Sequence, residues 1–155
     1  MSRQGKYLFN TSSHISRAGL ENSASWVVPK NHLIFSMYAS IGLVSITKIE
    51  IAISQAVLGI KFKKDIDLEF MYYLLIFLKN NLNKFVGEGT QKNLNAFTVR
   101  NLEFFIPNFT NQERISKQLN DMDISISILN TKLQKLKLQK QGMMQALLTG
   151  KIRLR

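Results

Sequence analysis

Residues 115–147 read ISKQLNDMDISISILNTKLQKLKLQKQGMMQAL, and this stretch decides how the chain is organised. Its apolar side chains recur at alternating intervals of four and three residues, the spacing that keeps one stripe of an α-helix facing a partner helix. Lys140 is the one polar side chain in that series. The pattern predicts a long helix that pairs in a coiled coil. The stripe, called the seam below, comprises Ile115, Leu119, Met122, Ile126, Leu129, Leu133, Leu136, Met143 and Leu147.

A continuous helix over residues 111–147 would be about 55 Å long at roughly 1.5 Å per residue. The rest of the chain needs no helix of that length for its own core, and monomers rarely leave such an apolar stripe in water. We therefore expect the seam to be covered by a second copy of the chain. An isologous, antiparallel homodimer is the pairing that closes most simply. Ile124, Ile128 and Leu138 lie off the seam and give the helix a second apolar face.

The segment before this helix has the pattern of a mixed domain. Residues 33–60 are rich in Ile, Val and Tyr with partial alternation, which predicts at least two short strands, while Gly42 and Gly59 mark turns or close backbone approaches. Residues 26–29 predict a short extended segment that Pro29 ends, and residues 102–106 predict a strand that Pro107 stops.

A buried helix is predicted over residues 68–85, where nearly every position of the first part is apolar. Asp65 or Asp67 can cap its first turn, and lysines gather near its end, as the helix dipole favours. With the strands and the long helix, this gives an α+β fold class. The expected domains are a globular domain over residues 1–108, a spacer helix over 109–149 and a basic tail over 150–155.

The composition excludes several classes of function. With no cysteine and two histidines, the chain has no disulfide framework, thiolate zinc site or Cys nucleophile, and little material for a His-based metal centre. The Gly-rich phosphate loop, the Gly-x-Ser-x-Gly elbow and His-Glu-x-x-His do not occur. We therefore expect no catalytic residues and no bound metal or cofactor. No membrane-length apolar run or secretory signal is present, so we expect a cytoplasmic protein.

The net charge is +11, and it is concentrated in two zones. Residues 1–64 carry eight basic and two acidic side chains, and residues 124–155 carry seven basic and none acidic. Such an excess on a folded chain favours a polyanionic partner, most often a nucleic acid. A solvated basic surface and an anionic membrane surface are the alternatives.

The C-terminal run LQKLKLQKQGMMQALLTGKIRLR, residues 133–155, resembles the end of the specificity subunit of type I restriction-modification systems. In that family a conserved helix closes with a Met-Gln-x-Leu-Leu-Thr-Gly-Lys-x-Arg-Leu signature, which residues 144–154 match. The preceding IPNFTNQERISKQLNDMD, residues 106–123, resembles the family's entry to the same helix, with Asn111-Gln112-Glu113 close to the usual Glu-Gln pair. Upstream, LIFSMYASIGLVSI, AISQAVLGI and GEGTQKNLN resemble three stretches of its target-recognition domain, in the expected order.

The resemblance implies a half-length form of a non-catalytic subunit that reads double-stranded DNA. Full-length subunits of the family hold two target-recognition domains apart with two antiparallel helices, whereas this chain has one of each. Its recognition domain is also shorter than usual, which indicates either a truncated gene product or a minimal form. The implied partners are a modification subunit, which binds S-adenosylmethionine and methylates adenine, and in some systems a restriction subunit.

We assign DNA contacts by side-chain chemistry. Lysine and arginine neutralise phosphates without regard to sequence, whereas amide side chains can pair with adenine edges. The expected phosphate contacts are Arg17, Lys30, Lys48, Lys61 and Lys63; those nearer the bases are Ser40, Gln55, Gln91, Lys92 and Asn93. Two other functions stay open at this point: an unrelated dimeric RNA-binding module, and an adaptor that binds only protein through its helix.

Overall fold

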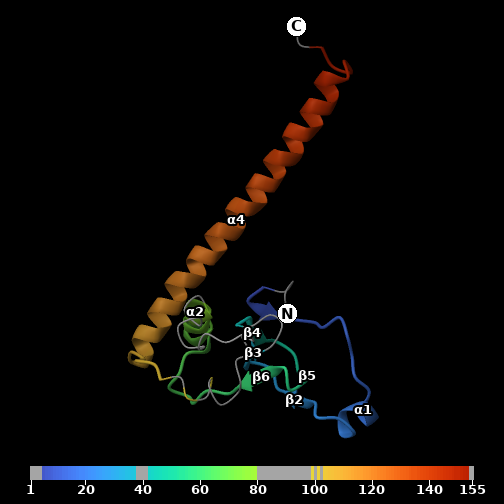
Figure 1. Cartoon of the computed structure of the whole chain (residues 1–155). Helices are drawn as coiled ribbons and strands as arrows, with labels where there is room; N and C mark the ends of the chain where they lie inside the picture. Colours follow the sequence, from blue (N-terminus) through green and yellow to red (C-terminus); the bar gives the residue numbers. More distant parts are fainter. Residues whose placement is uncertain (1–4, 38–41, 80–98, 100, 102, 154–155) are drawn as a thin grey trace, which may run out of the picture. The chain divides into compact units, whose positions relative to one another are not determined.

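The computed structural model describes residues 5–37, 42–79, 99, 101 and 103–153 (Figure 1). The chain divides into two compact units, Met1–Ser116 and Lys117–Arg155. Among the described residues, the first unit contains all the strands, two complete helices and the first turns of the long helix, and the second unit is the greater part of that helix. The architecture is α+β with a long C-terminal helix, as the sequence predicted.

The first unit is built on a four-stranded mixed sheet in the order β1-β4-β3-β6. The strand β1 runs parallel to β4, whereas β3 is antiparallel to both β4 and β6. A second, two-stranded antiparallel sheet pairs β2 with β5. The strands are β1 Tyr7–Leu8, β2 Trp26–Val28, β3 Leu33–Ser36, β4 Val44–Thr47, β5 Ile51–Ile53 and β6 Val57–Ile60.

The central strand β3 is buried on both faces because successive side chains point to opposite sides of a strand. Leu33 and Phe35 pack into one core with the helix α2, Leu68–Lys79. Ile34, between them, packs into a second core with side chains of β2 and β5, such as Val28. The four-stranded sheet is therefore the middle layer, with α2 on one face and the small sheet on the other.

The helix α2 begins where the sequence predicted a cap. Asp67 accepts a hydrogen bond from the backbone N–H of Phe70 at 2.7 Å, which satisfies one of the amides that a helix start leaves unpaired. Glu69 lies in the first turn and Lys79 in the last. The predicted continuation to residue 85 lies outside the described residues.

A part-buried polar cluster joins the N-terminal strand to α2. The Lys6 ammonium lies 3.0 Å from a Glu69 carboxylate oxygen and 4.4 Å from the centroid of the Tyr73 ring. The Tyr7 hydroxyl donates to the other oxygen of Glu69. These contacts hold the two-residue strand β1 against the helix and compensate for the burial of the charges.

The two glycines within the strand region have the roles that the sequence predicted. Gly42 lies between β3 and β4 with a φ of 76°, the left-handed conformation that a turn requires and glycine adopts without strain. Gly59, in β6, lies against Trp26 and Val28 of the small sheet, so a side chain there would collide with both.

The predicted strand over residues 102–106 is wrong for the residues that the structure describes. Residues 103–106 have no regular secondary structure, and the Phe105 side chain is 99% exposed. Phe104 and Ile106 line an apolar cavity of about 340 Å³ beside α2 instead of pairing with a strand. Apolar residues before a proline do not make a strand unless a sheet edge is there to receive their backbone hydrogen bonds.

The long helix α4 spans Phe109–Leu148, which is 40 residues (Figure 1). Asn108 caps its start by accepting from the backbone N–H of Asn111 at 3.0 Å. Its C-terminus turns at Gly150, whose φ is 71°. Within the described part of the chain, no helix combines the length and the apolar character needed to cross a bilayer.

Candidate nucleic-acid interface

Strand register brings basic side chains from separate segments to one end of the four-stranded sheet. Leu33, the first residue of β3, pairs with Ile46 of β4 and with Ile60 of β6. Strands β4 and β6 therefore end where β3 begins. The residues that flank these strand ends, called the basic end below, include Lys30, Lys48, Lys61, Lys63 and Lys64.

The turn that carries Lys30 is fixed by hydrogen bonds to β4. The backbone N–H of Asn31 donates to the carbonyl of Thr47 at 2.7 Å, and the Thr47 hydroxyl donates to the carbonyl of Pro29 at 2.8 Å. The Thr47 side chain is buried, and the N–H of His32 donates to its hydroxyl at 3.0 Å. Asn31 has a φ of 59°, so the turn is tight. Lys30 is thus held on a rigid backbone.

The lysines of the basic end differ in how far their charge is available. Lys30, Lys61 and Lys63 are exposed. Lys48 is half-buried, and its ammonium lies 4.7 Å from the centroid of the Tyr7 ring, which is a cation–π contact. Lys64, which was not among the predicted contacts, is exposed beside Lys63. Its position in a run of three lysines within four residues is the signal that could have identified it.

The other candidate contacts are not gathered there. Gln55 precedes β6, whose first residue Val57 pairs with Ser36, so the amide belongs to the opposite end of the sheet. Arg17 begins the short helix α1, Arg17–Glu21, and forms an exposed ion pair with Glu21 at 3.0 Å. The remaining four candidates, Ser40, Gln91, Lys92 and Asn93, lie outside the described residues.

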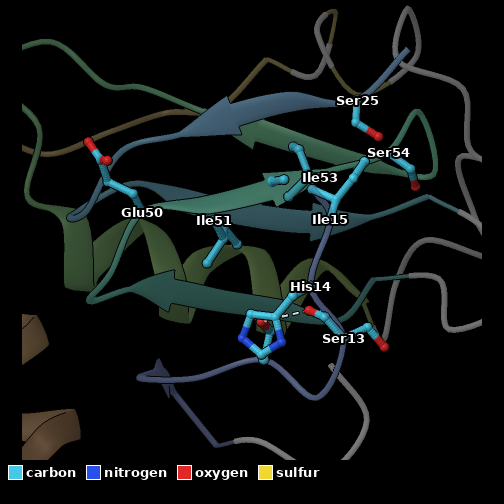
Figure 2. Close-up of a pocket in the computed structure, with 10 residues that line it drawn as sticks. Ser13, His14, Ile15, Ser25, Glu50, Ile51, Ile53 and Ser54 are labelled. Atoms are coloured by element: carbon cyan, nitrogen blue, oxygen red, sulfur yellow. Dashed lines mark hydrogen bonds between the residues drawn. The ribbon is translucent and has the colours of Figure 1, made fainter. Parts of the chain in front are cut away.

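A cleft of about 430 Å³ lies between the loop before α1 and the strand β5 (Figure 2). Its wall includes His14, Ser25, Glu50 and Ser54, and the Thr11 hydroxyl donates to the carbonyl of Ser13 at 3.0 Å within it. None of its lining residues is lysine or arginine. The cleft therefore lacks the positive charge that a phosphate backbone requires, and the basic end is the better candidate for DNA.

Metal binding has no cluster of ligands to support it in the part of the chain that the structure describes. No three His, Asp or Glu side chains come together there in a way that could hold a metal ion. His14 is exposed, and a ring nitrogen of His32 contacts the carbonyl of Lys30 at 3.0 Å.

The seam runs along α4 with most of its side chains exposed. Leu129 is 64% exposed and Leu136 is 53% exposed, whereas Leu119 and Leu147 are half-buried. Across the 40 residues of this helix, the buried side chains are Gln112 and Ser116. The apolar stripe predicted from the spacing is thus exposed over most of its length on a single helix.

A second exposed apolar stripe follows the opposite side of the same helix. Ile124, Ile128 and Leu138 fall at positions c and f when the seam occupies a and d of each heptad, and each is more than half exposed. A groove of about 330 Å³ lies beside Ile128 and is bordered by Lys132 and Lys135. One partner helix on the seam would leave this second stripe uncovered.

Known proteins resemble the chain over most of its length. Residues 2–138 match the model of the family described as type I restriction modification DNA specificity domain. Among curated proteins, the chain is 28% identical over 130 residues to the putative type I restriction enzyme MjaX specificity subunit of Methanocaldococcus jannaschii. It is 29% identical over 97 residues to the MjaVIII specificity subunit of the same organism.

The aligned regions cover 83% and 61% of this chain but only 31% and 23% of those two relatives. The chain therefore spans less than a third of their length.

Two solved structures share its fold. One belongs to a study of complex assembly and conformational transition of a type I R-M system, with a TM-score of 0.68 and 16% identity. The other is the HsdS subunit of Thermoanaerobacter tengcongensis, with a TM-score of 0.60 and 15% identity. Each alignment covers 77% of this chain and 30% of the solved chain.

Proposed function

Because this chain belongs to the type I restriction modification DNA specificity domain family, we propose that it binds double-stranded DNA as a specificity subunit without catalytic residues of its own. The observation that carries the proposal is the exposed seam of α4, since a single recognition unit needs a second one to read a bipartite target. Two copies joined through their helices supply that second unit.

The basic end supplies the affinity in this proposal. Lys30, Lys61 and Lys63 are exposed on neighbouring segments of the sheet and can neutralise phosphates along one strand. Lys48 and Arg17 are already engaged with Tyr7 and Glu21, so they contribute less. Base readout falls to Ser40, Gln91, Lys92 and Asn93, the candidates with short polar, amide or amine groups. Gln55, which was also expected near the bases, lies at the opposite end of the sheet from the basic end.

The seam supplies the dimer. A leucine on this stripe, such as Leu129, stands in water in the single chain and would fill a hole between four residues of a facing helix in a coiled coil. An antiparallel arrangement brings the seam of each copy onto the same surface of the other, which is the closed twofold pairing. Lys140 at a core position weakens the pair but fixes its register.

A twofold dimer of identical readers binds an inverted, interrupted target. The helix α4 has 40 residues and would be about 60 Å long at roughly 1.5 Å per residue. This length bounds the separation of the two half-sites at about 18 base pairs, taking roughly 3.4 Å per pair.

The partner enzymes complete the proposed activity. A modification subunit, which would bind S-adenosylmethionine, and in some systems a restriction subunit would be directed by this chain to the bipartite site. The relatives named for type I restriction enzymes and for complex assembly support this part of the proposal. The basic second half of α4, which carries Lys132, Lys135 and Lys137, is the part of the chain left for such a partner.

Two measurements test the proposal. Size-exclusion chromatography with light scattering at micromolar concentration should give twice the chain mass, and a stable monomer would rule out the dimer. Selection from random DNA, with the partner methyltransferase present, should enrich an interrupted inverted motif. A preference for RNA in a parallel selection would favour the RNA-binding alternative, and no enrichment in either pool would favour the protein adaptor.

A further inference from the structure

The start of α4 is attached to the globular unit through a buried amide side chain. Gln112 is 2% exposed, although its neighbours Asn111 and Glu113 are exposed. Its amide oxygen accepts a hydrogen bond from the backbone N–H of Asp67 at 2.8 Å. Its amide nitrogen donates to the carbonyl of Pro107 at 2.9 Å and to that of Asp65 at 3.3 Å. Both ends of the amide are therefore used.

These partners connect three elements of the first unit. Asp67 caps α2 with its carboxylate while its own N–H donates to Gln112, so this single residue joins the start of α2 to the start of α4. Pro107 ends the segment that leads into α4, and Asp65 belongs to the loop before α2. Two directional bonds, to Asp65 and Asp67, thus hold the first turns of α4 at the N-terminus of α2, while the bond to Pro107 fixes the segment that leads into α4.

The chemistry of this attachment differs from that of the rest of the core. Gln112 and Ser116, one turn apart on the same face, are the buried side chains of α4, and both are polar. An apolar contact would hold the helix equally well at several rotations, because the hydrophobic effect is non-directional. An amide with three partners is satisfied in one orientation only, since a rotation leaves buried polar groups unpaired.

We propose that Gln112 is a positioning residue that sets the orientation in which α4 leaves the globular unit, and thereby the half-site separation that the dimer accepts. The second part rests on the proposed function. Ser116 does not share the role, because its hydroxyl donates within the helix, to the carbonyl of Glu113 at 3.1 Å. The orientation of α4 depends on the amide of Gln112 and not on burial alone.

The direct test measures how narrowly α4 is held. The chain has no cysteine, so Ala52→Cys on the exposed face of β5 and Ser127→Cys on the exposed helix can be spin-labelled selectively. Pulsed electron paramagnetic resonance, with labelled protein diluted in unlabelled protein, gives the distance distribution within one chain. The unmutated background should give one narrow peak. Gln112→Met, which keeps the length but removes the amide, should broaden the peak at least twofold.

Three further variants make this result decisive. Gln134→Met, at an exposed position of the same helix, and Ser116→Ala should both leave the distribution unchanged. Gln112→Glu keeps the acceptor for Asp67 but places oxygen against the carbonyls of Pro107 and Asp65, so it should also broaden the peak. Circular dichroism identifies the folded variants. A narrow peak in a folded Gln112 variant, a broad peak in the unmutated background, or the failure of both Gln112 variants to fold would overturn the positioning role.

A second readout links the orientation to DNA. In selection with the methyltransferase, the unmutated chain should enrich one spacer length, and Gln112→Met should enrich the same half-sites with several spacer lengths. If the unmutated chain enriches no interrupted motif, the proposed function fails while the distance measurement still decides the role of Gln112. If the variant keeps a single spacer length, the link between Gln112 and half-site separation is wrong.

Discussion

The indole ring of Trp26 lies directly against the backbone of Gly59, so closely that a Cβ atom at residue 59 would come within 2.5 Å of the indole Cη2 atom. The same Cβ would approach a methyl group of Val28 at 2.8 Å. This contact joins β2 of the small sheet to β6 of the large one. It requires glycine at residue 59 because of space and not because of backbone conformation.

Gly59→Ala should therefore destabilise the globular unit by about 1–3 kcal/mol, the usual cost of forcing an extra carbon into a packed region. The single tryptophan of the chain reports the change directly, since its emission should shift when the ring is displaced. Urea denaturation followed by fluorescence measures both effects. Gly142→Ala is the matched control: a Cβ there meets no atom, and alanine should stabilise the helix by roughly 0.5–1 kcal/mol. Equal stability of Gly59→Ala and the unmutated chain would contradict the packing argument.

Lys6→Met should lower the free energy of unfolding by about 1–3 kcal/mol, because it removes an ammonium that lies 3.0 Å from a part-buried Glu69 carboxylate oxygen. The Lys6 and Glu69 side chains are only 11% and 28% exposed. Arg17→Met is the control, since the Arg17–Glu21 side chains are 92% and 61% exposed and such surface pairs contribute well under 1 kcal/mol. Thermal or urea denaturation of both variants gives the comparison. Equal losses of stability in the two variants would show that the Lys6–Glu69 pair contributes no more than the exposed Arg17–Glu21 pair.

Lys61→Ala should weaken DNA binding at every sequence tested and reduce the slope of log K against log salt by about one unit, as for the loss of one phosphate contact. Lys63→Ala should act in the same way, because both side chains are exposed at the basic end. Lys79→Ala, at the end of α2, removes the same charge elsewhere and should leave the slope unchanged. Fluorescence anisotropy across a salt series measures these slopes. If all three variants keep the salt slope of the unmutated chain, the DNA binds to another surface.

Gln91→Ala should blur the choice of target while leaving the salt slope nearly unchanged, because an amide reads bases and does not neutralise phosphates. Lys92→Ala should instead reduce the slope. Competition between selected and scrambled DNA at fixed salt separates the two effects. If Gln91→Ala weakens the binding of both DNAs by the same factor, Gln91 contacts the phosphate backbone of the DNA and not its bases.

Leu129→Asp should dissociate the dimer, with a rise in Kd of roughly 100-fold or more, because a carboxylate buried in the seam costs at least about 3 kcal/mol. Leu138→Asp is matched to it in chemistry and helix, and it lies on the opposite side. That variant should leave the dimer intact. Sedimentation equilibrium distinguishes the two, and dissociation by Leu138→Asp alone would move the interface to the second stripe.

The sequence predicted those features that depend on local periodicity. The four-and-three spacing between Ile115 and Leu147 indicated the long helix, which the structure has over Phe109–Leu148. Asp67 caps α2 as an acid before an apolar run should. Pro29 directly follows β2, whose last residue is Val28. In each case the residues that determine the feature lie within a few positions of it in the sequence.

Features that depend on residues far apart in the sequence could not be predicted from it. The strand β1 has two residues and exists because it pairs in parallel with β4, which no pattern near Tyr7 announces. Residues 103–106 have strand-like composition but no strand, because composition cannot show whether a sheet edge is available. Gln112 carries no apolar signal, yet it is among the most buried side chains of the chain.

The candidate DNA contacts show the same division. Chemistry selected Lys30, Lys61 and Lys63, and strand register then placed them at one end of the sheet, with Gln55 at the other. Because register depends on how two strands pair, the sequence alone could not show that these lysines and Gln55 lie at opposite ends of the sheet. The contacts themselves stay predictions until binding is measured.

The absence of buried apolar side chains along α4 also bears on how this gene can change. Residues such as Leu33 are constrained by neighbours encoded in the same chain, whereas exposed seam residues such as Leu129 meet no such constraint in the single folded chain. Genetic drift along the helix is then limited by whichever polypeptide lies against it. In the proposed dimer, covariation across related genomes should therefore link seam positions with one another.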